Sequence, residues 1–172
     1  MVGVLYESEE WSSYKLLEEI QSFGIKACLI SLEEDHAFEL VNGCDLLVCR
    51  IFASAPFRGH HKSLERMPEV IKRAERKGIP MINPPRAHFY ETSKALSTAL
   101  LRQKGIAVPD VYGVFLPDEI DPGSLSYPCI IKPDCGGRTT CTVIISEAGK
   151  LAETLVEIPA IRMIAEEYIR PV

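Results

Sequence analysis

The stretch YPCIIKPDCGGR, residues 127–138, decides how the second half of this chain is interpreted. Its short apolar run is typical of a buried strand, and that strand ends at Lys132. A loop with two adjacent glycines follows, and Gly136 and Gly137 permit close approach of the backbone to a ligand. Successive N–H groups of such a loop form a concavity for anions, over which Lys132 would place a cation. The stretch therefore predicts either a phosphate cradle or a plain β-hairpin whose Lys132 reaches water.

The residues around this stretch predict an α+β unit with an antiparallel sheet. A helix is expected over 92–104, because Leu96 and Leu100 share one face and Gly105 follows as a stop signal. A second, short helix is expected over 151–157. The expected strands of this half are 111–116, 129–132, 141–145 and 161–169.

The first half alternates strand and helix patterns and predicts a small doubly wound α/β domain with a parallel sheet. The expected strands are 2–6, 26–32, 44–50 and 79–82, and the expected helices are 8–23 and 64–77. Asn83-Pro84-Pro85 interrupts the pattern, since neither proline can continue a strand ladder. We therefore expect one domain at 1–84 and a second at 85–172.

Composition narrows the functional class. The chain has 172 residues with 19 basic and 24 acidic side chains, a net charge of −5. Nucleic-acid surfaces need clustered Lys and Arg, so a nucleic-acid partner is not expected. No apolar run approaches the roughly 20 residues of a membrane span. We expect a cytoplasmic protein without a membrane partner and with reduced cysteines.

Two further motifs point towards a phosphate ligand. Lys94 lies in the first turn of its helix, where the helix dipole disfavours a cation but attracts an anion; it is either a phosphate contact or an ordinary surface lysine. The strand that ends in Glu166, Glu167, Tyr168 and Ile169 could offer a purine one backbone acceptor and one donor. Otherwise, the two glutamates form the polar face of an edge strand.

Taken in order, these motifs resemble the ATP-grasp superfamily, and within it the RimK-like glutamate ligases and the lysine-biosynthesis ligases. The matching stretches are Gly78-Ile79-Pro80 with Asn83, Ser93-Lys94, Gly105 to Pro109, Ile131-Lys132-Pro133, Cys135 to Arg138, and Glu166 to Ile169. The resemblance spans nearly the whole chain. It implies a pre-ATP-grasp α/β domain at 1–84 and, at 85–172, the α+β nucleotide-binding lid of the ATP-grasp fold.

The resemblance assigns roles to the lysines and to the loop. It implies that Lys94 and Lys132 hold the phosphates of ATP. It also implies that Gly136, Gly137 and Arg138 form a mobile loop that closes over those phosphates. The loop is less rich in glycine and serine than is usual in the family.

The resemblance also assigns residues to the purine and to the acceptor substrate. It implies that Glu166 approaches the adenine amino group, while the Glu167 carbonyl and the Ile169 amide read the purine edge. Arg50, at the end of the third strand, matches an arginine that would face an amino-acid or peptide substrate. A strand-end charge without such a role is the alternative.

The implied activity is that of an ATP-dependent carboxylate–amine ligase working through an acyl phosphate with Mg²⁺. Family members continue into a half that supplies the metal ligands, and nothing in this sequence resembles it. We therefore expect this chain to be the ATP-binding part, inactive alone, with no metal site of its own and with exposed apolar surface that favours homo-oligomers. The rival interpretation is a non-catalytic binding or scaffold protein.

Overall fold

The computed structural model describes residues 1–7, 10–137, 139, 141–156 and 161–170. The chain divides into two compact units, which we call unit 1 (Met1–His88) and unit 2 (Phe89–Val172). Each is described by itself. Within the described residues, no helix is both long and apolar enough to span a bilayer.

Unit 1 is built on a parallel sheet. Its strands are β1 (Val2–Tyr6), β2 (Ala27–Ser31), β3 (Leu46–Cys49) and β4 (Met81–Ile82). Their order is β2-β1-β3-β4, and each neighbouring pair runs parallel. The predicted doubly wound α/β arrangement is confirmed, because β2 and β3 pair with opposite edges of β1 and the strand order therefore reverses there.

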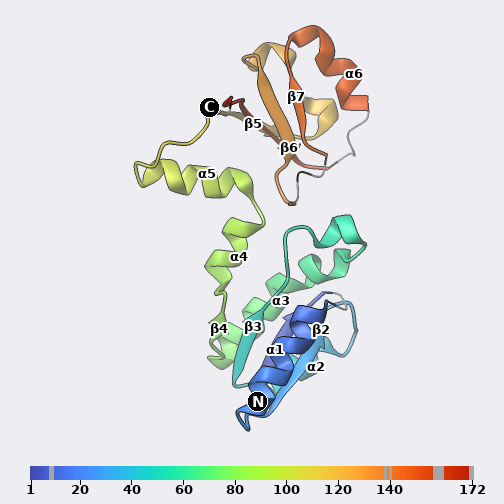
Figure 1. Cartoon of the computed structure of the whole chain (residues 1–172), viewed down its shortest axis with the longest axis vertical. Coiled ribbons are helices and arrows are strands. Elements are labelled where there is room, and N and C mark those ends of the chain that lie inside the picture. Colours follow the sequence, from blue (N-terminus) through green and yellow to red (C-terminus); the bar gives the residue numbers. More distant parts are fainter. Residues whose placement is uncertain (8–9, 138, 140, 157–160, 171–172) are drawn as a thin grey trace. The chain divides into compact units, whose positions relative to one another are not determined.

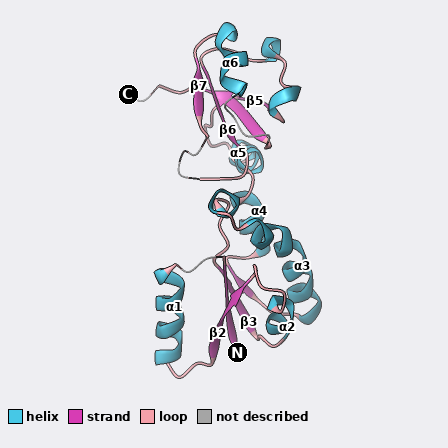
Figure 2. Ribbon diagram, turned by 90° about the vertical axis from the view of Figure 1, so that its right-hand side faces the viewer, coloured by secondary structure: helices cyan, strands magenta, loops and turns pink. Residues whose placement is uncertain are grey.

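Helices cover both faces of this sheet. They are α1 (Trp11–Ser22), α2 (Ala37–Asn42) and α3 (His61–Lys77), with a short 3₁₀ turn η1 (Ala55–Arg58). Figure 2 shows α1 on one face and α2 with α3 on the other. The larger core lies on the α2–α3 face, where Leu5, Leu47 and Met67 are fully buried. As the sequence predicts, α3 ends at Lys77, and the following Gly78 has a φ of +66°, which favours glycine.

The segment after β4 differs in part from the sequence prediction. The strand ends before Asn83-Pro84-Pro85, as expected, and Asn83 adopts a positive φ of 56° while its Nδ2 donates to the Cys49 carbonyl at 2.9 Å. Pro85, however, starts a helix, α4 (Pro85–Glu91). Proline suits a first helical position, since its missing N–H has no helical partner there. The division between the two units falls within α4.

Unit 2 carries an antiparallel sheet with helices, as predicted. Its strands are β5 (Val111–Phe115), β6 (Cys129–Pro133), β7 (Val143–Ile145) and β8 (Met163–Glu167), in the order β5-β8-β6-β7. Its helices are α5 (Lys94–Gln103) and α6 (Leu151–Val156), and 3₁₀ turns η2, η3 and η4 lie at Pro117–Glu119, Pro122–Ser124 and Ala148–Lys150. Because β8 is an inner strand, the interpretation of its glutamates as the face of an edge strand is wrong.

The two faces of the unit 2 sheet differ in chemistry. Alternate residues of a strand point to opposite faces, and in β6 the side chains of Cys129 and Ile131 are fully buried. They pack in an apolar cluster that includes Leu151 of α6. The opposite face carries Lys132 and Glu166. Figure 1 shows α5 and α6 at separate places around this sheet.

Candidate functional site

An ion pair lies on the face of the unit 2 sheet away from α6. Lys132 Nζ is 2.5 Å from Glu166 Oε2, and the Glu166 side chain is only 4% exposed. The register explains the contact: Ile130 is opposite Glu166 and Lys132 is opposite Ile164, so the two charged side chains are diagonal neighbours on one face. Lys132 therefore does not simply extend into water, because a buried carboxylate holds it.

Lys94 is held by the segment that follows β6. Its Nζ donates to the carbonyl oxygens of Pro133 at 2.7 Å, Gly136 at 2.8 Å and Asp134 at 3.4 Å. Burial, and then the positive charge of Lys132, lower the pKa of Lys94 below its usual value. The ammonium group of Lys132 is therefore near enough to Lys94 to disfavour its charged form.

The start of α5 is fixed by Asp134, a residue to which the sequence assigned no role. The Asp134 carboxylate is 5% exposed and accepts hydrogen bonds from Ser93 Oγ at 2.9 Å and from the Ala95 N–H at 2.9 Å. Arg162 Nε lies 3.4 Å from the same group. A carboxylate at a helix N-terminus satisfies free N–H groups and favours the dipole. Asp134 thereby ties the loop after Lys132 to the helix that begins with Lys94.

A pocket of about 430 Å³ lies between α5 and the first residue of β5. Its lining residues are Ala95, Thr98, Ala99, Arg102, Gln103 and Val111. Thr98 connects it to the charged face, because Thr98 Oγ1 donates to Glu166 Oε1 at 3.4 Å. The first part of the α5 wall carries the small side chains of Ala95, Thr98 and Ala99, whereas its C-terminal part carries the long polar side chains of Arg102 and Gln103. Neither Thr98 nor the pocket was found from the sequence, since no local pattern marks a helix face that a distant strand approaches.

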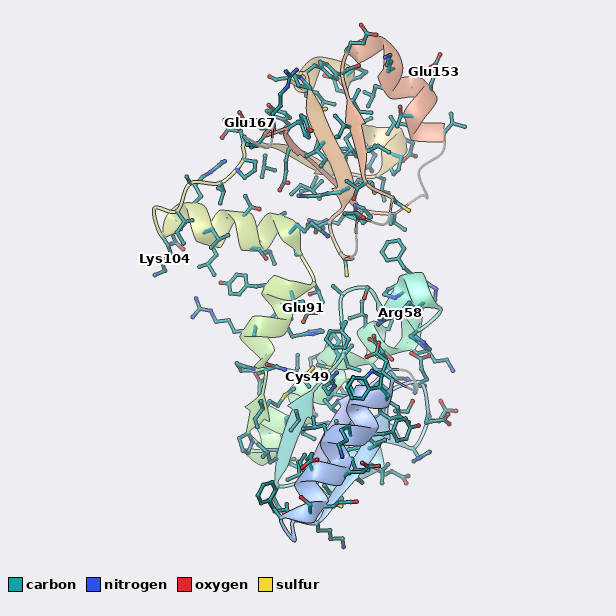
Figure 3. All side chains as sticks on the ribbon, viewed as in Figure 1. Cys49, Arg58, Glu91, Lys104, Glu153 and Glu167 are labelled. Atoms are coloured by element: carbon teal, nitrogen blue, oxygen red, sulfur yellow. The ribbon has the colours of Figure 1, made fainter. Side chains whose placement is uncertain are left out.

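The remaining residues assigned to the purine lie at the end of β8. The N–H of Glu167 donates to the Asp110 carbonyl at 2.8 Å, and its carboxylate accepts from the Asp110 N–H at 3.3 Å. Ile169 lies past the end of the strand and is 59% exposed. Figure 3 shows the labelled Glu167 at the margin of the unit 2 sheet.

Of the three loop residues that the resemblance assigns to the phosphates, the structure describes Gly136 and Gly137. Gly136 has a φ of 148°, which side chains rarely tolerate, and its carbonyl faces Lys94. Gly137 follows it and is half-buried. Arg138 lies outside the described residues.

Arg50 lies in unit 1, directly after β3. Its guanidinium donates to Ser12 Oγ at 2.9 Å and to Ser13 Oγ at 3.2 Å, and it lies 5.4 Å from the centre of the Phe52 ring. These partners orient the guanidinium without cancelling its charge.

A second charged pair near the ends of β1 and β3 was not found from the sequence. Glu7, after β1, is buried, forms an ion pair with Arg58 and accepts from the Phe52 N–H at 3.0 Å. Figure 3 labels Arg58 and also Cys49, the last residue of β3. In parallel sheets, crevices at strand carboxyl ends beside the point where the strand order reverses bind ligands. Arg50 and Arg58 follow strands on that side of unit 1.

Within the ranges that the structure describes, no group of three or more His, Cys, Asp or Glu residues is placed to hold a metal ion.

Solved structures share this arrangement of elements. A D-alanine–D-alanine ligase from Bacillus anthracis superposes with a TM-score of 0.68 at 20% identity, over 98% of this chain and 57% of that one. The chain has the ATP-grasp fold. A RimK-domain ATP-grasp protein from Sphaerobacter thermophilus gives a TM-score of 0.64 at 16% identity, over 98% of this chain and 64% of that one.

A third ATP-grasp structure was solved with ligands. The ATP-grasp ligase PsnB, complexed with a minimal precursor, Mg and ADP, gives a TM-score of 0.58 at 19% identity, over 98% of this chain and 65% of that one. The chain thus spans 57% to 65% of the length of these three proteins. No family model and no curated protein matches it. At these identities the likeness establishes the ATP-grasp fold, with a parallel first unit and an antiparallel second one.

Proposed function

We propose that this chain binds ATP in unit 2 and is the nucleotide-binding part of an ATP-dependent carboxylate–amine ligase of the RimK-like kind. The observation that carries the proposal is that Lys132 pairs with the buried Glu166 near Lys94, and that Thr98, the hydroxyl donor to Glu166, lines a pocket of about 430 Å³. Two cations suit a polyphosphate, and a buried carboxylate next to a pocket suits a base that donates hydrogen bonds. The ATP-grasp fold agrees with this choice of ligand.

Each part of the nucleotide has a proposed partner. The ammonium groups of Lys94 and Lys132 attract the phosphates, and the loop at Gly136, Gly137 and Arg138 covers them. The Glu166 carboxylate accepts from the amino group of adenine. The Glu167 carbonyl and the Ile169 N–H read the purine edge.

The ligase reaction has two balanced steps. The oxygen of a substrate carboxylate attacks the γ-phosphorus of ATP, and the bond to the β,γ-bridging oxygen breaks, which gives an acyl phosphate and ADP. An amine then attacks the acyl carbon, loses a proton and expels phosphate, which leaves an amide. Lys94 and Lys132 would orient the triphosphate for in-line attack and balance its negative charge.

The acceptor is proposed to be an amino acid or a peptide, with Arg50 facing its carboxylate. Hydroxyl groups and an aromatic ring hold the Arg50 guanidinium, so its charge is available to an anion. Arginine binds carboxylates through two parallel hydrogen bonds.

Magnesium accompanies ATP in phosphoryl transfer. The described side chains offer no cluster that fits it. We therefore assign no residue and no step of this chain to the metal.

The test is ATP binding by the purified chain, measured by isothermal titration. Lys132→Ala removes one phosphate contact and should weaken ATP binding by about 100-fold or more, since a charged contact to a phosphate is replaced by none. Lys104→Ala is the matched control, because Lys104 is an exposed lysine of the same unit that follows the C-terminal end of α5 and has no role in the proposed site.

Lys104→Ala should leave the affinity within about twofold of the unaltered chain. Wild-type protein that binds no ATP would favour the scaffold interpretation. Equal binding by the Lys132→Ala and Lys104→Ala variants would remove Lys132 from the site.

A further inference from the structure

The Lys132–Glu166 ion pair restricts which ligands can bind at the proposed nucleotide site of unit 2. The Glu166 side chain is 4% exposed and that of Lys132 is 25% exposed, so the carboxylate has little access to water. Removing the partner of a buried charge leaves that charge uncompensated, which is strongly unfavourable. An anion that draws Lys132 away therefore disturbs Glu166 as well.

The second oxygen of Glu166 offers only weak compensation. Oε1 accepts from Thr98 Oγ1 at 3.4 Å, a long contact for a hydroxyl donor. Thr98 also lines the pocket, as does Val111, which lies opposite Glu166 in the β5–β8 register, so we expect a donor group bound there to reach this oxygen. A bound group can thus replace at Glu166 what the phosphate removes.

Ligands differ in whether they offer both an anion to Lys132 and a hydrogen-bond donor to Glu166. Inorganic triphosphate offers anions to Lys132 but no donor to Glu166, and its charge also repels that carboxylate. A nucleotide whose base carries an amino group offers both at once. A nucleotide with a carbonyl oxygen in place of the amino group presents an acceptor to an acceptor.

We propose that the Lys132–Glu166 ion pair is an internal competitor that makes this site selective for amino-bearing purine nucleotides over inorganic polyphosphates. The proposal rests on ATP binding in unit 2 as proposed above. Glu166 acts as a specificity-determining residue: in the empty site it occupies Lys132, and only a ligand that engages Glu166 releases the lysine without leaving a buried charge alone.

The experiment compares inorganic triphosphate with ATP on the full chain by isothermal titration. Glu166→Gln removes the charge, nearly preserves the shape and frees Lys132. It should tighten triphosphate binding by about tenfold and lower the ratio of ATP to triphosphate affinity by at least that factor.

Glu153→Gln is the matched control, because it removes an equal charge from an exposed glutamate of α6, the helix that packs on the opposite face of the unit 2 sheet. It should change triphosphate affinity by no more than about twofold if the ion pair rather than general repulsion is responsible.

The outcomes separate the two proposals. Absence of ATP binding by the unaltered chain overturns the proposed function together with this inference. ATP binding combined with an unchanged triphosphate affinity in Glu166→Gln overturns the inference alone. Should Glu166→Gln fail to fold, the unaltered chain decides: it must bind ATP at least about tenfold more tightly than inosine triphosphate and inorganic triphosphate, and equal affinities refute the ion-pair competitor.

Discussion

The two units place their charged groups in different parts of their sheets. In unit 1, Arg50 and Arg58 lie beyond the strands, near the carboxyl ends of β1 and β3. In unit 2, Lys132 and Glu166 belong to the strands themselves and pair across β6 and β8. In unit 1 these two arginines therefore belong to segments after a strand, whereas in unit 2 the ion pair belongs to the strands of one sheet face.

The difference follows from how each sheet is covered. A parallel sheet is buried on both faces by its crossover helices, so only the strand ends remain for polar groups. An antiparallel sheet can keep one face apolar and leave the other to a ligand. Unit 2 does this, since α6 packs on the apolar face and the charged face meets α5. A parallel sheet therefore leaves its strand ends for a polar site, whereas an antiparallel sheet can offer one whole face.

The largest difference between the units is expected when their cations are removed. Lys132→Met leaves Glu166 buried and unpaired, and should lower the free energy of unfolding by about 3 kcal/mol. Arg50→Met breaks hydrogen bonds to neutral hydroxyls and should cost about 1 kcal/mol. Urea denaturation of both variants checks this, with Lys104→Met as an exposed control. Equal losses of unfolding free energy for Lys132→Met and Arg50→Met would contradict the expected difference between a charge on the sheet face and a charge after a strand.

A smaller effect is expected from two carboxylates that meet helix starts. Asp134 accepts from the Ala95 N–H of α5, and Glu33 accepts from the Ser63 N–H of α3 at 2.9 Å. Asp134→Ala and Glu33→Ala should each cost about 1–2 kcal/mol of unfolding free energy, because each removes a capping acceptor.

Only Asp134→Ala should also weaken ATP binding, since Asp134 fixes the helix that begins with Lys94. Asp134→Asn keeps an acceptor and should restore most of that binding in titration. A loss of ATP affinity in Glu33→Ala as large as in Asp134→Ala would show that both effects come from stability alone.

The smallest expected effect concerns the pH dependence of ATP affinity, which should differ between the wild type with Lys94 and the Lys94→Arg variant. The pKa of Lys94 lies below the ordinary value of 10.5 because of burial and the nearby Lys132 charge. Raising the pH through the window just below 10.5 therefore neutralises Lys94 before an ordinary lysine, and ATP affinity should fall there. A lowered pKa has the opposite sign for stability: the charged form is disfavoured in the folded chain at neutral pH, and this penalty disappears as the pH rises.

Titration of ATP at a series of pH values checks this for the wild type and for Lys94→Arg, whose guanidinium stays charged. The contribution of residue 94 to the fall should vanish in Lys94→Arg. An identical pH profile in both proteins would contradict the assignment.

Much of the fold was predictable because the patterns are local. The parallel first half follows from short apolar runs alternating with helical stripes, and the structure places its strands within the expected ranges. Two helices were missed. α2 has only six residues, too few for a periodic pattern, and α4 begins at Pro85, which was interpreted as an interruption. A proline that ends a strand and a proline that begins a helix look alike in a sequence.

The candidate site was predictable in its cations but not in their partners. Lys94 and Lys132 stand out because a lysine is unusual at a helix start and at the end of an apolar strand. Asp134 lay within the quoted loop, yet nothing local indicates that its side chain would reach the start of α5. The contact from Thr98 to Glu166 joins residues that are far apart in the chain, so no spacing could reveal it.

The sequence alone determined which residue types alternate along each strand, where the helices stop and which side chains carry charge, because these depend on neighbours within a few positions. The tertiary structure alone decided that β8 is an inner strand, that Glu166 is buried against Lys132, and that a pocket opens between α5 and β5. Strand order and burial arise from contacts between distant segments, and no local pattern encodes them.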